Sequence, residues 1–153
     1  MEDCLSSEVL DIVISVKEQY LAMILAGEKK VELRRKTVNV PPGSRVWLYA
    51  TCPSAQFCAY ATVENITSDS PQVIWRKYHR EVGISSEEYD LYMAGASVAC
   101  AITLRDIRRM NPKLSLAELR KKVKGFHPPQ FFKKLTHDSA ERELLRSRAF
   151  DMS

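Results

Sequence analysis

The stretch "GEKKVELRR", residues 27–35, sets two lysines, two glutamates and two arginines around only two apolar residues. It follows a segment, 17–26, whose apolar residues recur at helical spacing. Gly27 is a typical left-handed terminator for that helix. After the turn the side chains alternate, so that Val31 and Leu33 share one face, as expected of a strand. The stretch therefore predicts a helix, a turn and a strand with one apolar face.

The charged residues of this strand, Lys30, Glu32 and Arg34, fall on the opposite face. Because side chains two residues apart point the same way, the Cα atoms of Glu32 and Arg34 are expected roughly 6 to 7 Å apart on that face. From spacing alone, two interpretations stay open. The charges form an exposed, mutually neutralising face worth about 0 to 1 kcal/mol per pair, or they point toward a ligand.

The β-branched run "DIVISV" predicts a strand before the helix, and Ser15 with Glu18 resembles a capping box at the helix start. Further strands are predicted after the stretch. The residues between strand 56–66 and strand 97–107 are predicted to be mostly helical, with Ser85 as a cap. The predicted strands are 11–16, 30–34, 45–50, 56–66 and 97–107.

A further helical turn is predicted at "NPKLSLAELRKKVKG", where Ser115 and Glu118 match a capping box. Its basic residues, 119–125, fit either a solvated helix face or a phosphate contact. The order of elements is strand, helix, three strands, helix, strand. Short strands with interspersed helices in this length predict an α+β fold, a small mixed β-barrel of about five or six strands flanked by helices.

Composition limits the class of protein. The chain has 153 residues, the size of one domain, and its net charge of +4 favours anionic partners. No basic leader, no apolar run of about 18 residues and no cysteine–histidine spacing for zinc is present, so we expect a soluble, cytoplasmic protein without membrane contact, metal or cofactor. The scattered cysteines are expected to be reduced: Cys4, Cys52, Cys58 and Cys100.

Four segments together resemble the ASCH domain family, a branch of the PUA-like superfamily: "GEKKVELRR", "VWLYATCPS", "VGISSEEYDLYMAG" and "PPQFFKKL". The first matches the G-x-K-x-x-E-x-R signature. The resemblance covers residues 11–135, which leaves an N-terminal segment, 1–10, and a C-terminal helical tail, 136–153. It implies a curled barrel with a cleft beside the signature strand.

The resemblance also implies a function. PUA-like relatives bind RNA or modified bases, and ASCH proteins are expected in RNA metabolism or transcription regulation. RNA or a modified nucleotide is therefore the expected partner. Some similar proteins are predicted transcriptional regulators with a helix-turn-helix, but this chain has too few residues outside the barrel for one. Sequence-specific reading of duplex DNA is not expected.

Placed in the cleft by the resemblance, Lys29, Glu32 and Arg34 become the candidate ligand-binding residues. A carboxylate accepts hydrogen bonds from exocyclic amino groups such as cytosine N4, while arginine and lysine donate to base acceptors and phosphate. Tyr49 could stack on a base beside Trp47, although aromatic residues on a strand commonly belong to a core. Thr51 and Ser54 follow the end of that strand, where small hydroxyl residues can line a pocket.

Two other functions stay open. A small bacterial ASCH enzyme hydrolyses N4-acetylcytidine, and its proposed catalytic lysine, threonine and glutamate correspond to Lys29, Glu32 and Glu81 here. With glutamate in place of threonine, Glu32 would act as a general base on water and Lys29 would stabilise the oxyanion. Alternatively, Phe131 and Phe132 in "FHPPQFF" could bind a protein partner, or could close the barrel as an apolar plug.

Overall fold

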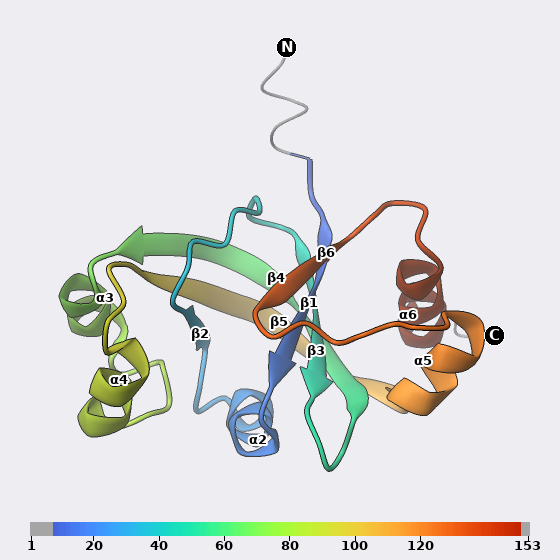
Figure 1. The fold of residues 1–153 in the computed structure, drawn as a ribbon, viewed down its shortest axis with the longest axis horizontal. Coiled ribbons are helices and arrows are strands. Elements are labelled where there is room, and N and C mark those ends of the chain that lie inside the picture. Colours follow the sequence, from blue (N-terminus) through green and yellow to red (C-terminus); the bar gives the residue numbers. More distant parts are fainter. Residues whose placement is uncertain (1–7, 151–153) are drawn as a thin grey trace.

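The computed structural model describes residues 8–150, and Cys4 and most of segment 1–10 lie outside this range. Six strands form one mixed sheet in the order β2-β5-β4-β3-β1-β6, which curls into a half-barrel (Figure 1). Only β1 and β3 pair in parallel; the other neighbours are antiparallel. The predicted α+β class and the small mixed barrel of six strands are confirmed. The strands are β1 Asp11–Val16, β2 Val31–Arg34, β3 Arg45–Ala50, β4 Gln56–Asp69, β5 Ala99–Ser115 and β6 Phe132–Leu135.

Helices cover both ends of the sheet (Figure 1). At one end α3 and α4 pack with β2 and the first half of β5 around Val31 and Leu33. At the other end α5 and α6 close a core around Trp47 and Phe57. A third apolar cluster lies between them and is covered by α2. The helices are α2 Glu18–Ala26, α3 Pro71–Tyr78, α4 Ser86–Met93, α5 Leu116–Lys122 and α6 Ala140–Phe150.

Local sequence signals fix several element ends. The capping box of Ser115 with Glu118 is present, as predicted. Ser85 caps α4, as predicted, and also forms a capping box with Glu88. Gly27 ends α2 in the left-handed conformation, with φ of +81°. The capping box predicted for Ser15 is wrong, because α2 begins after Lys17 and has no side-chain cap.

Strand β3 is buried on both faces. Val46 and Leu48 point into the cluster under α2, whereas Trp47 and Tyr49 point into the core under α5 and α6. Trp47 is fully buried and Tyr49 is 3% exposed. Of the two interpretations for these aromatic residues, core packing is therefore the one that the structure shows.

Several elements differ from the sequence prediction. The one helix predicted before strand 97–107 is two helices, α3 and α4, and β4 ends at Asp69 instead of residue 66. Strand β5 continues eight residues further, from the predicted end at Ile107 to Ser115, because its exposed second half pairs with the start of β4. Strand β6 was not predicted; it forms by pairing with β1, and Phe132 packs half-buried against the central cluster. Helix α6 packs on the sheet through the fully buried Leu145. Within residues 8–150, no helix combines the length and apolar character that a membrane crossing requires.

Candidate functional site

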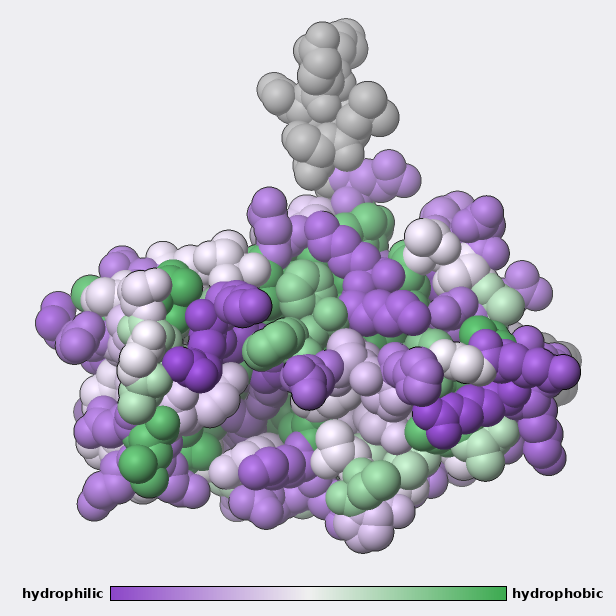
Figure 2. All heavy atoms as spheres, viewed as in Figure 1, coloured by the Kyte–Doolittle hydropathy of each residue, from purple (hydrophilic) through white to green (hydrophobic). Residues whose placement is uncertain are grey.

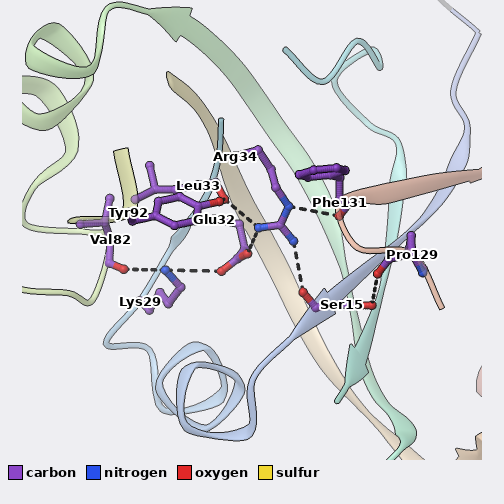
Figure 3. A network of polar contacts seen from close by, with 9 residues as sticks. All are labelled: Ser15, Lys29, Glu32, Leu33, Arg34, Val82, Tyr92, Pro129 and Phe131. Atoms are coloured by element: carbon purple, nitrogen blue, oxygen red, sulfur yellow. Dashed lines mark hydrogen bonds and ion pairs between the residues drawn. The ribbon is translucent and has the colours of Figure 1, made fainter. Parts of the chain in front are cut away.

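Arg34 joins two parts of the sheet that are not neighbours in strand order. Its Nε donates to the carbonyl of Phe131 at 3.1 Å, and its Nη2 donates to the carbonyl of Ser15 at 3.2 Å. Phe131 precedes β6 and Ser15 lies in β1, whereas Arg34 ends β2 at the opposite edge (Figure 3). The Ser15 hydroxyl in turn donates to the carbonyl of Pro129 at 2.7 Å. Arg34 therefore closes the open seam of the half-barrel.

Glu32 lies between two cations beside this seam. Its Oε2 is 2.5 Å from Nη1 of Arg34, and its Oε1 is 3.4 Å from Nζ of Lys29. The Lys29 ammonium also donates to the carbonyl of Val82 at 2.5 Å (Figure 3). Only 3% of Lys29, 5% of Glu32 and 7% of Arg34 is exposed. Two positive charges and one negative charge are thus held nearly out of solvent, which leaves one positive charge uncompensated.

The turn after α2 positions Lys29. Backbone amides of Glu28 and Lys29 both donate to the carbonyl of Met23, so the chain turns sharply back toward β2. Gly83 supports the lysine stem from the other side: its φ is +72°, and a Cβ at this position would lie 3.2 Å from both Cβ and Cδ of Lys29. The lysine stem therefore fits against a residue that has no side chain.

Burial changes the acid–base properties of the site. Desolvation lowers the pKa of the Lys29 ammonium, an effect that the nearby Glu32 carboxylate opposes and that the Arg34 guanidinium reinforces. Burial likewise raises the pKa of Tyr92, whose hydroxyl donates to the carbonyl of Leu33 at 3.2 Å. An incoming negative charge would compensate the excess positive charge at Lys29, so the site favours anionic ligands.

A pocket of about 580 Å³ opens over this charged group, within the volume range of small-molecule sites. Three aromatic side chains line it: Tyr20 from α2, Tyr92 from α4 and Phe131 before β6. Lys29 Nζ lies 5.6 Å from the centre of the Tyr20 ring. Hydrophobic side chains gather near the middle of the face shown in Figure 2, with hydrophilic ones on both sides. The pocket thus combines aromatic walls with a buried cationic floor.

The cations at the rim of the pocket are more accessible. Lys17 and Arg35 line it and are exposed. Lys36 places its ammonium 4.9 Å from the centre of the Phe131 ring. These side chains surround the entrance with positive charge that solvent can reach, in addition to the buried charge below.

The structure brings together three of the predicted site residues, Lys29, Glu32 and Arg34. The alternative of an exposed, mutually neutralising face formed by Lys30, Glu32 and Arg34 is wrong in its exposure, because Glu32 and Arg34 are buried and only Lys30 is exposed. Glu81 contributes its backbone carbonyl, which accepts from the amides of Lys30 and Val31, and the acid that lines the pocket from this region is Glu88 instead. The hydrolase set carried over from the resemblance is therefore only partly assembled.

The remaining candidates lie elsewhere. Tyr49 packs edge-on against Phe57 in the core, with ring centres 5.1 Å apart, and does not line the pocket. Thr51 donates its backbone amide to the carbonyl of Val16. Ser54 hydrogen-bonds Glu18 and lines a different pocket. Tyr49, Thr51 and Ser54 therefore do not line the pocket that contains Lys29.

Sequence reasoning missed most of the pocket wall. From the sequence, Tyr20 belongs to the predicted helix 17–26 and Tyr92 to the family motif "VGISSEEYDLYMAG", and neither pattern indicates a place in the pocket wall. Phe131 was considered as a contact for a protein partner; it is 42% exposed and lies in the pocket wall. No spacing rule could find these residues, because they come from three separate parts of the chain. Among residues 8–150, no group of three or more potential metal ligands is present.

Comparisons with known proteins agree with this architecture. Residues 9–125 match a family model described as "Domain of unknown function (DUF365)". The chain is 32% identical over 120 residues to an "ASCH domain-containing ribonuclease" of Zymomonas mobilis, which covers 78% of this chain and 80% of that protein. The chain belongs to the ASCH domain family. The resemblance stated from the four sequence segments is thereby confirmed.

Solved structures show the same ASCH fold. A crystal structure of ASCH from Zymomonas mobilis superposes with a TM-score of 0.82 at 31% identity and covers 90% of this chain and 94% of that chain. Human THYN1, solved in complex with DNA containing 5-methylcytosine, has a TM-score of 0.55 at 14% identity over 90% of this chain and 96% of its own. This second likeness concerns the fold alone.

Proposed function

We propose that this ASCH protein binds single-stranded RNA with one nucleotide in the pocket over Lys29, and that it cleaves RNA there. The observation that carries the proposal is the buried Lys29–Glu32–Arg34 group, with its uncompensated positive charge at the floor of an aromatic pocket. The Zymomonas mobilis relative named as a ribonuclease supports the choice of RNA and of cleavage.

Each part of the pocket has a task in binding. Tyr20, Tyr92 and Phe131 offer faces on which a base can stack, a contact worth about 1 to 3 kcal/mol per base. Glu32 presents acceptor oxygens for an exocyclic amino group such as cytosine N4. Arg34 keeps Glu32 in place, because most of its N–H groups already donate to Glu32 and to three backbone carbonyls.

Lys29 is the residue assigned to cleavage. Its ammonium has a third N–H beyond those directed to Val82 and Glu32. In the cleavage step the ribose 2′-hydroxyl attacks the adjacent phosphorus and gives its proton to solvent, while the bond from phosphorus to the 5′-oxygen of the next nucleotide breaks and that oxygen takes a proton from solvent. The products are a 2′,3′-cyclic phosphate and a free 5′-hydroxyl. In a desolvated site the Lys29 charge stabilises the negative charge that develops on phosphoryl oxygens in the transition state far more than it would in water. Lys17 and Arg35 at the rim hold the phosphates on either side.

The test uses fluorescein-labelled oligocytidine of ten nucleotides, with binding followed by fluorescence anisotropy and cleavage followed on gels. For binding, the 2′-hydroxyls are methylated so that a 2′-hydroxyl attack cannot cut the strand. Lys29→Met keeps an apolar stem and leaves Glu32 paired with Arg34, so no buried charge is stranded. We expect about tenfold weaker binding and loss of cleavage.

Lys30→Met is the matched control, because Lys30 is the exposed neighbour of Lys29 and does not line the pocket. We expect it to retain binding and cleavage within about twofold. Wild type, K30M and K29M are purified in the same way. If only K29M is inactive, the cleavage does not come from a contaminating nuclease. Wild-type protein that neither binds nor cuts RNA, or K29M that behaves as wild type, would contradict the proposal.

A second candidate is hydrolysis of N4-acetylcytidine, favoured by the 3.4 Å contact between Lys29 and Glu32 in a pocket large enough for a nucleoside. Glu81 does not line the pocket, so this reaction would depend on Glu32 as the base. The same preparations incubated with N4-acetylcytidine distinguish the two. Release of cytidine by wild type and not by K29M would assign this activity instead of cleavage of the RNA strand.

A further inference from the structure

A second pocket, of about 560 Å³, lies on another side of α2. Its floor is apolar and includes Leu21 and Leu25 of α2, Cys58 of β4 and Met110 of β5, all buried or half-buried. Its rim is polar and includes Arg109, Asn111 and Lys113 from the second half of β5. None of the residues assigned above to RNA binding or cleavage lines this pocket.

The two pockets adjoin across one strand pairing. Val16, the last residue of β1, lines the first pocket, and its partner in the parallel register, Ala50 of β3, lines the second. Paired strands lie about 4.8 Å apart. Helix α2 divides the pockets, since Tyr20 contributes to the first whereas Leu21 and Leu25 contribute to the second. The two pockets therefore lie on either side of α2 and meet at the buried ends of β1 and β3.

Positive charge at the second pocket is available to a ligand. Arg109 and Lys113 are exposed, and their side chains form no ion pair or hydrogen bond with any residue in the range 8–150. The acid in the wall, Glu18, accepts a hydrogen bond from Ser54. The chemistry is an apolar floor beneath two free cations.

We propose that this second pocket is a subsite for the neighbouring nucleotide of the same RNA strand. The base lies on the apolar floor, and Arg109 and Lys113 each bind one of the two phosphates that flank it. Charge complementarity and the shared boundary at Val16 and Ala50 favour a continuous polyanion over a separate small ligand. The inference rests on the proposed function, because it extends the path of the RNA that the first pocket binds.

The test compares a short and a long probe. Cytidine 5′-monophosphate occupies one pocket only, whereas the ten-nucleotide methylated oligocytidine can span both. For the double variant Arg109→Ala/Lys113→Ala we expect unchanged affinity for the mononucleotide and about tenfold weaker binding of the oligonucleotide, with the slope of log K against log salt reduced in size by about 1.4 for two lost phosphate contacts.

Arg76→Ala/Lys77→Ala is the matched control, since it removes the same two charges from exposed positions on α3 that line neither pocket. If both double variants lose affinity equally, the effect is one of net charge and the subsite is refuted. If R109A/K113A binds the oligonucleotide as wild type does while K29M does not, the subsite fails and the proposed function stands. Polyglutamate that competes for the R109-dependent binding as well as RNA does would also overturn the nucleotide subsite. Wild type that binds no RNA removes both proposals.

Discussion

Two buried carboxylates in this protein, Glu32 and Asp11, have the same exposed fraction, 5%, and each lies between two cations. The cations of Glu32 are Lys29 and Arg34, whose side chains are only 4% and 8% exposed. The cations of Asp11 are two arginines of α6, with side chains 20% and 38% exposed. The two clusters therefore have the same formal charges but differ in how much water reaches the cations.

The surroundings explain what each cluster does. Asp11 also accepts from Nε1 of the buried Trp47 at 2.9 Å, while Arg142 and Arg146 remain hydrated and dock α6 on the sheet. The Glu32 cluster instead faces a pocket. A carboxylate with two cations is therefore not itself a sign of a ligand site. What marks the site is that its excess charge is desolvated and next to a cavity.

The largest difference is expected when each carboxylate is neutralised. Glu32→Gln leaves two nearly buried cations without a counter-charge, which should lower the free energy of unfolding by about 3 to 5 kcal/mol. Asp11→Asn leaves arginines that water can still solvate, so we expect a loss of about 1 to 2 kcal/mol. Urea denaturation followed by circular dichroism measures both.

Glu64→Gln serves as the control for this prediction, because Glu64 is exposed on β4 and forms no ion pair with the residues that the structure describes. Its effect should stay within about 0.5 kcal/mol. If D11N costs as much as E32Q, then the exposure of the cations does not separate the two clusters, and the distinction drawn between them is lost.

The Glu32 cluster also shows how far the sequence alone reached. Alternation in β2 correctly placed Glu32 and Arg34 on one face, because side-chain period is a local property of a strand. It could not reveal that this face is buried, since the acceptors at Ser15 and Phe131 are 19 and 97 residues away. The same limit explains the missed β6, a four-residue strand that exists through its pairing with β1.

Helix caps depend mainly on neighbouring residues. Of the three serine caps predicted from the sequence, two are present. Ser85 and Ser115 cap their helices through partners three residues later. Ser15 has the same pattern, but its hydroxyl donates to Pro129, 114 residues away, so a tertiary contact overrides the local motif. For Tyr49 the sequence left core packing and base stacking both open, and the tertiary contacts of β3 place this residue in the core and outside the pocket.

Substitution of Gly83 tests whether the Glu32 cluster, unlike the Asp11 cluster, depends on a tightly held Lys29 side chain. Any residue with a Cβ is strained at its φ of +72°, by about 1 to 2 kcal/mol. In Gly83→Ala the new Cβ also crowds Lys29 and Met23, which should cost about 1 kcal/mol or more beyond the strain and weaken RNA binding. Thermal unfolding and anisotropy measure the two effects.

Gly125→Ala is matched to this change, since φ at Gly125 is +78° but nothing lies within 4 Å of the added Cβ. It should share the strain of G83A and leave RNA binding at the wild-type level. Equal stability and equal affinity in both variants would show that the lysine stem is not held by contact with Gly83.

At alkaline pH, loss of a proton should affect the cations of only the Glu32 cluster, because arginines stay protonated at all accessible pH values whereas Lys29 does not. Burial lowers the pKa of Lys29 below its ordinary value of 10.5 in the folded state. Between the lowered pKa and 10.5 the unfolded state holds more protons, so the Lys29 contribution to the free energy of unfolding rises with pH.

RNA affinity should change in the opposite direction, since it needs the protonated ammonium and is lost as pH rises through the lowered pKa. Wild type and K29M share the other titratable groups that line the pocket, namely Lys17, Tyr20, Glu32, Arg34, Arg35, Glu88 and Tyr92. Subtracting the pH profile of K29M from that of wild type isolates Lys29. A midpoint at or above 10.5 in the difference profile would contradict the desolvated site.

The smallest effect is expected from Tyr92→Phe, because the ring and the hydroxyl of Tyr92 have separate tasks. Tyr92→Phe removes the hydrogen bond to the carbonyl of Leu33 and should lower the free energy of unfolding by about 0.5 to 1.5 kcal/mol, with RNA affinity unchanged because the stacking face remains. Tyr92→Ala removes the face as well, and the affinity should fall by about 1 to 3 kcal/mol. Anisotropy on both variants separates the two tasks: if Y92F weakens binding as much as Y92A, the pocket reads the hydroxyl and the aromatic wall is not a stacking surface.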